Sequence, residues 1–193
     1  MTTTNSTPSP YKVPSIWSNV VSEVLLTPEQ IATRNTELGH HLTQIYHNKN
    51  PILLAVLKGS IIFLSDLSRQ IHTPHELHFI TASSYNGTSS SGHVKLSGLD
   101  RINLKDRHVL LIEDIVDTGL TLKSIVEQLK MEGPASLKIC TFLLKETDKR
   151  LKQTPEVDFV AHRVEDRFVV GYGLDVDQKY RHLPFLGIYK KGA

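Results

Sequence analysis

Two adjacent carboxylates, Glu113 and Asp114, directly follow the aliphatic run at residues 109–112. Ionised carboxylates at this position accept hydrogen bonds from hydroxyl groups or bind a divalent cation. The loop that follows contains Asp, Thr, Gly and Thr, and its backbone N–H groups can bind an anion where a helix begins. A ribose 5-phosphate has both a diol and a phosphate, so it is a ligand that suits both groups.

A predicted strand and a predicted helix hold these residues in place. The run 109–112 is typical of a buried strand, which we expect to end at the two carboxylates, and Leu122, Ile125 and Leu129 then recur at helical spacing. In an open α/β sheet, a loop between a strand and a helix lies at the carboxyl edge of the strands, where ligands bind.

A second unit of the same kind lies earlier in the chain. The apolar run 52–57 suits a central parallel strand that is covered on both faces, and Lys58, Gly59 and a helix over residues 61–71 follow it. A glycine at such a turn lets the backbone approach a ligand closely. An ordinary strand-to-helix turn is the alternative interpretation of this stretch.

The rest of the pattern predicts an α/β fold. Thr27, Pro28 and Gln30 are typical of a capping box, which begins a helix that ends near His47. Further strands are expected at residues 76–82, 136–144, 157–161 and 188–189. Strands that alternate with helices in this way indicate a central, mostly parallel sheet flanked by helices.

Two polar segments stand apart from this pattern. Residues 1–14 are rich in Ser, Thr and Pro and are expected to form a flexible tail, so that residues 15–193 form a single domain. Residues 82–93 are mostly polar and include Ser84 and Tyr85. A stretch of this length fits either a mobile lid that carries a contact residue or a flexible surface hairpin, and we favour the lid.

Composition narrows the class of protein. The 193 residues are 39% hydrophobic and 22% charged, as in ordinary globular proteins. The net charge of +2 is too small to indicate nucleic-acid binding, and the apolar runs are too short to span a bilayer. Cys140 is the single cysteine, and the N-terminus lacks a signal-peptide pattern, so we expect a reducing, cytoplasmic location.

The stretch 109–122 resembles the phosphoribosyl pyrophosphate signature of the type I phosphoribosyltransferases. Both have a hydrophobic run, Glu-Asp, two aliphatic residues, Asp-Thr-Gly, one variable residue and Thr. Other segments resemble the 6-oxopurine branch of that family, the hypoxanthine or hypoxanthine-guanine phosphoribosyltransferases. These segments are Leu57–Ser60, Ser84-Tyr85, Lys145, Phe168–Tyr172, Leu174-Asp175 and Tyr180-Arg181. The resemblance covers roughly residues 20 to 190.

The resemblance implies an activity in purine salvage. In this reaction, N9 of a purine base displaces pyrophosphate from 5-phosphoribosyl 1-pyrophosphate in the presence of Mg²⁺. Hypoxanthine gives IMP, and guanine gives GMP. The resemblance also implies a homodimer or homotetramer, and a small hood subdomain formed by the N-terminal segment and residues 165–193.

The resemblance gives the acidic pair and the loop their roles. Glu113 and Asp114 would bind the ribose hydroxyls, directly or through metal-bound water. The loop that would bind the 5-phosphate consists of Asp117, Thr118, Gly119, Leu120 and Thr121. Some family members have Lys where this chain has Leu120.

The purine would be bound by residues from three separate segments. Asp117 resembles the family residue that hydrogen-bonds purine N7 and manages its proton, so it is the candidate catalytic residue, although it could instead only cap the following helix. Lys145 only donates hydrogen bonds, so it suits the O6 carbonyl and should reject adenine. Phe168 would stack on the purine, and the backbone of Val169 would contact the far edge of the ring. Asp175 is also among the residues expected to bind the purine.

The leaving pyrophosphate would lie against Lys58, Gly59 and Arg181, and Ser84 and Tyr85 would close over it. In the family, the peptide bond between Lys58 and Gly59 can be cis. The expected ligands of Mg²⁺ are Glu113, Asp114 and Asp175.

Three other functions are weighed against this one. A phosphoribosyl pyrophosphate-sensing regulator would need a nucleic-acid-binding surface or an added domain, for which the sequence gives no sign. A magnesium-dependent doubly wound protein with an acidic pocket would leave the Thr-Gly-Leu-Thr loop unexplained. The third is a transferase for xanthine, adenine or a pyrimidine; Lys145 disfavours adenine, whereas a preference for xanthine stays open.

Overall fold

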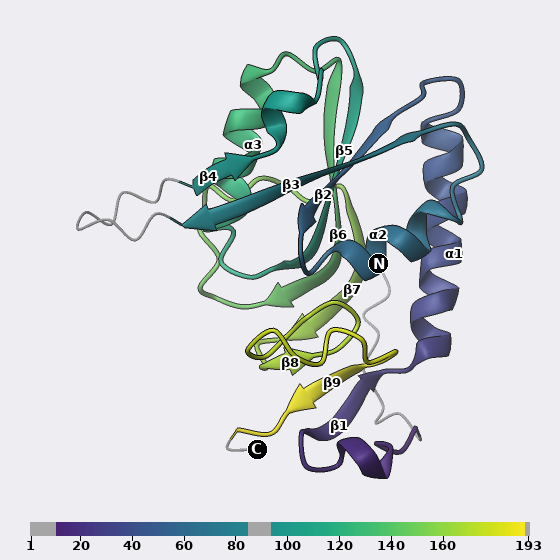
Figure 1. Ribbon diagram of the computed structural model, residues 1–193, viewed down its shortest axis with the longest axis vertical. Helices are drawn as coiled ribbons and strands as arrows, with labels where there is room; N and C mark the ends of the chain where they lie inside the picture. Colours follow the sequence, from purple (N-terminus) through teal and green to yellow (C-terminus); the bar gives the residue numbers. More distant parts are fainter. Residues whose placement is uncertain (1–10, 85–93, 192–193) are drawn as a thin grey trace.

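The computed structural model describes residues 11–84 and 94–191, without the side chain of Ser84. The described residues form one six-stranded sheet and one three-stranded sheet (Figure 1). Residues 85–93, which hold most of the expected lid, lie outside this description, as do residues 1–10 of the expected tail. Tyr11 and Val13 pack against the small sheet, so the packed chain begins before residue 15.

The large sheet has the order β4-β3-β2-β5-β6-β7, in which only β4 runs antiparallel to its neighbour among the described strands. Its strands are β2 (Ile52–Leu57), β3 (Glu76–Ser84), β4 (Val94–Ser97), β5 (His108–Val116), β6 (Ser136–Glu146) and β7 (Phe159–Glu165). This arrangement confirms the predicted central, mostly parallel sheet. Strand β4 directly follows the polar stretch 82–93, and no element was predicted there from the sequence.

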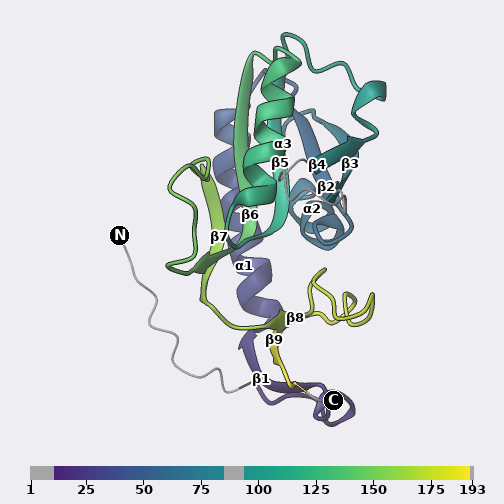
Figure 2. The same ribbon diagram turned by 90° about the vertical axis from the view of Figure 1, so that its left-hand side faces the viewer.

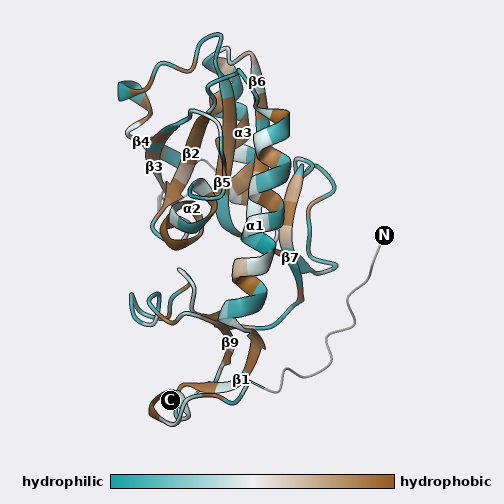
Figure 3. Cartoon of the chain, turned by 90° about the vertical axis from the view of Figure 1, so that its right-hand side faces the viewer, coloured by the Kyte–Doolittle hydropathy of each residue, from teal (hydrophilic) through white to brown (hydrophobic). Residues whose placement is uncertain are grey.

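Helices cover both faces of this sheet (Figure 2). They are α1 (Pro28–Ile45), α2 (Ile61–Ser68) and α3 (Leu120–Met131), and short 3-10 turns occur at Ser15–Trp17 and Leu99–Arg101. Successive side chains of a strand point to opposite faces, so Leu53 packs with α1 and α2, whereas Leu54 packs with α3. Figure 3 shows that the strands between the helices are mainly hydrophobic. Such two-sided burial explains why their apolar runs are continuous.

The start of α1 confirms the predicted capping box. The Thr27 hydroxyl accepts a hydrogen bond from the Gln30 backbone N–H, and the Gln30 side chain accepts one from the Thr27 N–H. Pro28 occupies the first turn, where a missing N–H does not disturb the helix.

The small sheet joins the two ends of the chain. β1 (Val21–Leu26) pairs antiparallel with β9 (Leu186–Tyr189), which also pairs with β8 (Val169–Val170). Val24, Val170 and Phe185 are buried together beside it. The division of the chain into a core and a hood remains a prediction.

The expected end of the central strand at Glu113 is wrong, because β5 continues to Val116. Pairing of β5 with β2 stops at Ile112, opposite Ala55, but pairing with β6 goes on to Val116. The two acidic residues therefore lie inside the strand, at the point where it separates from β2.

Candidate active site

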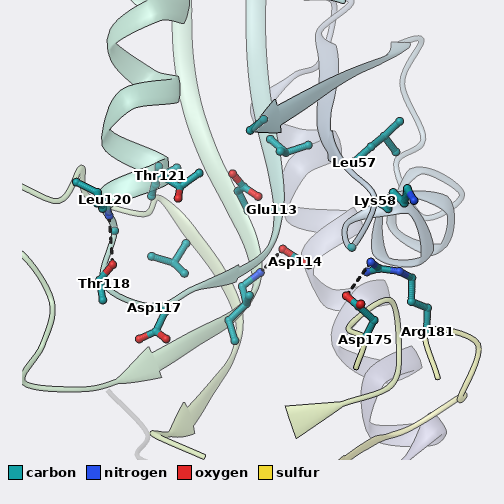
Figure 4. Close-up of a pocket in the computed structure, with 17 residues that line it drawn as sticks. Leu57, Lys58, Glu113, Asp114, Asp117, Thr118, Leu120, Thr121, Asp175 and Arg181 are labelled. Carbon is teal, nitrogen blue, oxygen red and sulfur yellow. Dashed lines mark hydrogen bonds and ion pairs between the residues drawn. The ribbon is translucent and has the colours of Figure 1, made fainter. Parts of the chain in front are cut away.

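A cleft of about 340 Å³ opens where β2 and β5 separate (Figure 4). From this point the chain continues to β3 on one side and to β6 on the other, which is the switch point where open α/β sheets bind ligands. Its lining comprises Val56–Gly59, Ala82, Glu113–Leu122, Asp175 and Arg181. Most of the expected sugar, phosphate and pyrophosphate residues therefore meet in one place.

The acidic pair lies at the centre of the cleft. Glu113 is 7% exposed, and burial together with the neighbouring charge of Asp114 raises the pKa of its carboxyl well above the usual value. Burial also raises the pKa of Asp114, although its Oδ1 accepts a hydrogen bond of 2.8 Å from the Ile115 N–H. Two buried carboxylates of this kind need hydroxyl donors or a cation to compensate their charge.

The turn after β2 packs tightly between the acidic pair and a C-terminal loop. A Cβ at Gly59 would collide with the Asp114 carboxylate, and a Cβ at Gly173 would collide with the Gly59 carbonyl oxygen. Gly173 also has a φ of +100°, which favours glycine. The cis peptide bond of this turn lies between Leu57 and Lys58, one residue before the Lys58–Gly59 bond that can be cis in the family.

The C-terminal loop supplies charged side chains opposite that turn. Arg181 forms an ion pair of 2.7 Å with Asp175 and donates a hydrogen bond of 2.8 Å to the Gly173 carbonyl oxygen. The Gln178 side-chain oxygen accepts hydrogen bonds from Lys58 Nζ at 3.1 Å and from Arg181 Nη2 at 3.3 Å. Sequence reasoning missed Gln178, since a glutamine between charged residues carries no pattern of its own.

Tyr172 fastens this loop to two helices. Its hydroxyl donates a hydrogen bond of 2.6 Å to Asp66 of α2 and accepts one of 2.7 Å from the Asn35 amide of α1. Burial and the neighbouring Asp66 raise the pKa of Tyr172, so the hydroxyl stays protonated. The loop that carries Asp175 and Arg181 is thereby held against α2, whose first turn follows Gly59.

The predicted phosphate loop connects β5 to α3. Gly119 has a φ of +82° and packs closely on Thr154. The Thr118 carbonyl oxygen accepts hydrogen bonds from the Leu151 N–H at 3.0 Å and from the Thr154 hydroxyl at 3.1 Å. Thr118, Leu120 and Thr121 are exposed toward solvent. The first N–H groups of a helix have no partner within it, so this loop is suited to an anion.

Asp117, at the start of this loop, forms an ion pair with Lys145 of β6. Lys145 Nζ lies 3.3 Å from Asp117 Oδ2 and 3.2 Å from Asp166 Oδ1, and its side chain is 12% exposed. Asp117 Oδ1 is buried and has no hydrogen-bond partner among the described residues. This free acceptor beside a donor-only lysine is suited to a ligand with an N–H and a carbonyl on adjacent positions.

Three of the expected purine residues, Lys145, Phe168 and Val169, are not in the cleft lining. Phe168 is 51% exposed, and its ring packs edge-on against Tyr189 at 5.6 Å between centroids. Val169 is 6% exposed in β8 and belongs to the main core. The structure thus places both beside the small sheet. Tyr85 lies outside the described residues, and Ser84 is described only as the last backbone position of β3.

The assignment of Glu113, Asp114 and Asp175 as ligands of Mg²⁺ stays a prediction. Within residues 11–84 and 94–191, no group of three His, Cys, Asp or Glu side chains is arranged to hold a metal. Asp175 is instead paired with Arg181, and its Oδ2 accepts a hydrogen bond of 2.9 Å from the Gln178 N–H. Mg²⁺ usually binds one or two carboxylates and completes its shell with water and substrate phosphates. Glu113 and Asp114 fit that smaller demand.

A family model described as "Phosphoribosyl transferase domain" matches residues 25–177. The chain belongs to the phosphoribosyltransferase family. This membership confirms the family that the sequence motif indicated, and it agrees with the fold and with the cleft at the switch point.

Two curated relatives and one solved structure show how close this family relationship is. The hypoxanthine-guanine-xanthine phosphoribosyltransferase of Tritrichomonas foetus is 40% identical, over 90% of this chain and 94% of the relative. The hypoxanthine phosphoribosyltransferase of Salmonella typhimurium is 43% identical, over 86% of this chain and 93% of the relative. The crystal structure of a hypoxanthine phosphoribosyltransferase from Staphylococcus aureus has a TM-score of 0.82 and 41% identity, and the match covers 93% of this chain and 97% of that one.

The relatives confirm that the chain belongs to a family of transferases and, within it, lies close to the hypoxanthine branch. Among the described residues, no helix is both long and apolar enough to cross a membrane.

The raised pKa of Glu113 leads to a prediction about this phosphoribosyltransferase. A carboxyl with a raised pKa in the folded state holds its proton to higher pH than in the unfolded state, so folding stability falls as pH rises from about 4.5 through the raised value. Glu113→Gln removes this loss. We expect the variant to be about 1 kcal/mol more stable than the parent at pH 8, or about 2 to 4 °C in Tm, and the difference to shrink toward pH 4.5.

Thermal unfolding of ligand-free protein at pH 5, 6.5 and 8 measures this difference. The exposed Glu156→Gln is the matched control, and we expect it to leave the pH dependence unchanged. A Glu113→Gln variant that is less stable than the parent at pH 8 would contradict the prediction.

Proposed function

We propose that the chain transfers the phosphoribosyl group of 5-phosphoribosyl 1-pyrophosphate to N9 of hypoxanthine and of guanine. The products would be IMP or GMP and pyrophosphate. The observation that carries this proposal is the ion pair of 3.3 Å between Lys145 and Asp117, the first residue of the loop between β5 and α3. It puts a hydrogen-bond acceptor and a hydrogen-bond donor beside the sugar-phosphate site. The names of the relatives from Tritrichomonas foetus and Salmonella typhimurium support the same choice of base.

Different residues of the cleft would bind different parts of the substrate. Glu113 and Asp114 would accept hydrogen bonds from the ribose hydroxyls, and this would compensate their buried charge. The 5-phosphate would be bound by backbone N–H groups and hydroxyls of Asp117, Thr118, Gly119, Leu120 and Thr121. The short loop held on Thr154 supports this role, since it is already fixed in shape.

The pyrophosphate would lie between the turn after β2 and the C-terminal loop. Lys58 and Arg181 both donate to the Gln178 oxygen, so their donors already converge on one acceptor that a phosphate oxygen could replace. The backbone of Gly59 would add a contact, and Ser84 and Tyr85 would close over the leaving group and exclude water.

Bound Mg²⁺ would neutralise charge on the pyrophosphate as the bond to the sugar breaks. Glu113 and Asp114 would hold one ion, and Asp175 would hold a second, for which it would have to release Arg181. Positive charge develops on the sugar in the transition state, and the acidic pair, whose position is fixed, would stabilise that charge.

The base would be recognised by the Asp117–Lys145 pair. Asp117 Oδ1 is buried and has no hydrogen-bond partner in the part of the chain that the structure describes, so it would accept a hydrogen bond from N7–H and take its proton as N9 attacks. Lys145 would donate to O6. The exposed ring of Phe168 would stack on the purine, and the Val169 backbone would contact its far edge. This assignment requires the purine to extend from the cleft toward the small sheet.

Xanthine is the second candidate base. Lys145 would donate a hydrogen bond to any purine with a carbonyl at position 6. The name of the relative from Tritrichomonas foetus also includes xanthine. We further propose that the protein works in the cytoplasm as a homodimer or homotetramer, as the family resemblance implies.

A spectrophotometric assay with phosphoribosyl pyrophosphate, Mg²⁺ and each purine in turn tests the proposal. Hypoxanthine and guanine are expected to give turnover, and kcat/KM for adenine should be lower by about 10⁴, since a site built for a carbonyl leaves its donor unpaired with an amino group. Reactions with a chelator in place of Mg²⁺ are the control. Binding of phosphoribosyl pyrophosphate without turnover of any 6-oxopurine would contradict the proposal and favour a regulator.

A further inference from the structure

We propose that Asp166 is a positioning residue that fixes the Lys145 ammonium for base recognition. This inference rests on the proposed function. It concerns a residue that the sequence motif does not include and that does not line the cleft.

Lys145 is held from two sides. Lys145 Nζ lies 3.3 Å from Asp117 Oδ2 and 3.2 Å from Asp166 Oδ1, while its side chain is only 12% exposed. An ammonium has three N–H donors, so two are engaged and one remains for a carbonyl oxygen. The Lys145 backbone is held as well, because its carbonyl oxygen accepts a hydrogen bond from Arg150.

Asp166 is itself held in place. Its second oxygen accepts a hydrogen bond of 2.7 Å from Lys149, and the bonds from Lys149 and Lys145 lower its pKa, so it stays ionised. It follows the last residue of β7, which pairs in parallel with the end of β6 where Lys145 lies. The anchor therefore comes from the neighbouring strand rather than from the phosphate loop.

The two anchors differ in what they do during the reaction. Asp117 is placed to accept a hydrogen bond from the base, and this use weakens its hold on Lys145. Asp166 is 34% exposed and does not compete for the base, so it keeps the ammonium in place when a purine binds. Without Asp166, Lys145 would turn toward Asp117 and occupy the acceptor that the purine needs.

The test compares Asp166→Ala, Asp166→Asn and Lys149→Gln in steady-state kinetics. Loss of one charge-assisted hydrogen bond to a partly exposed group changes an equilibrium by about ten-fold, so Asp166→Ala should raise KM for hypoxanthine by about that factor. We expect KM for phosphoribosyl pyrophosphate to stay within about two-fold, since Asp166 is outside the cleft lining. Asp166→Asn keeps an acceptor and should be intermediate. Lys149→Gln keeps an N–H donor for Asp166 and leaves the Asp166–Lys145 contact intact, so it should resemble the parent.

A second measurement does not depend on turnover. The rate at which an amine-reactive ester modifies Lys145 in the free protein, followed by mass spectrometry, should rise about three-fold or more in Asp166→Ala and stay unchanged in Lys149→Gln.

The two measurements separate the inference from the proposed function. Unchanged labelling of Lys145 in Asp166→Ala overturns the positioning role. An unchanged KM for hypoxanthine, or an equal rise in KM for phosphoribosyl pyrophosphate, also overturns it. If the parent protein turns over no 6-oxopurine, the proposed function fails, and the labelling rate alone decides whether Asp166 positions Lys145.

Discussion

Asp117→Asn is expected to lower kcat by about 10² to 10⁴, the usual range for the loss of a general acid–base group. The asparagine keeps the size of the side chain but cannot take a proton from purine N7. Thr154 packs on Gly119 and donates a hydrogen bond to Thr118, and these contacts fix the phosphate loop without Asp117. KM for phosphoribosyl pyrophosphate should therefore change little. Steady-state kinetics with hypoxanthine, and single-turnover measurements of the chemical step, check this result.

Lys145→Ala is the informative comparison for Asp117→Asn. The variant loses the ammonium that pairs with Asp117 but keeps the Asp117 carboxylate. It should therefore mainly raise KM for the base and weaken the preference for a 6-oxopurine. Equal loss of phosphoribosyl pyrophosphate binding in the two variants would show that both merely hold the loop in shape, and would contradict the separate roles.

Gly59→Ala is expected to weaken binding of phosphoribosyl pyrophosphate by about 100-fold, because the new methyl group would occupy the place of the Asp114 carboxylate. Either the acidic pair or the turn after β2 must move, and the cleft depends on both. Titration calorimetry with Mg²⁺ and phosphoribosyl pyrophosphate measures the change, and thermal unfolding checks that the variant is folded.

Gly133→Ala is the matched control for the glycine variant. Gly133 has a φ of +66° and open space around it, far from the cleft lining. It should lose about 1 kcal/mol of stability and keep its substrate affinity. Similar binding losses in the two variants would mean that Gly59 acts through general stability and not through contact with Asp114.

The sequence predicted the parts of the site that are continuous along the chain. The acidic pair, the loop after it and the turn at Lys58-Gly59 each lie between an apolar run and a helical repeat, so local pattern was enough to find them. Parallel strands bring their carboxyl ends to one edge of the sheet, and this rule accounts for their meeting in one cleft.

The parts that could not be predicted depend on pairing between distant segments. The strand end expected at Glu113 was wrong because β6 extends the pairing of β5 to Val116, and nothing within the run itself shows this. The contact between Gly59 and Gly173, and the double anchoring of Lys145, join residues that are remote in sequence. The expected Mg²⁺ ligands stay a prediction, and the ion pair of Asp175 with Arg181 is one more contact that local pattern did not show.

Phe168 shows the same limit for a single residue. Its assignment to the base stays a prediction, but the motif did not show that its ring packs on Tyr189 of β9 and lies outside the cleft lining. Only the pairing of the last strand with β8 brings Tyr189 to that position.

The pairing of β1 with β9 has a consequence for how the protein is made. β1 leaves the ribosome before any other strand described here, and its hydrogen-bonding partner β9 leaves last. Asp175 and Arg181 lie just before β9, so a nascent chain has no complete cleft until synthesis is almost finished. Throughout that interval the edge of β1 is uncovered, and an open strand edge is prone to pair with other chains. The newborn protein is therefore most exposed to aggregation when it still lacks the residues that complete its cleft.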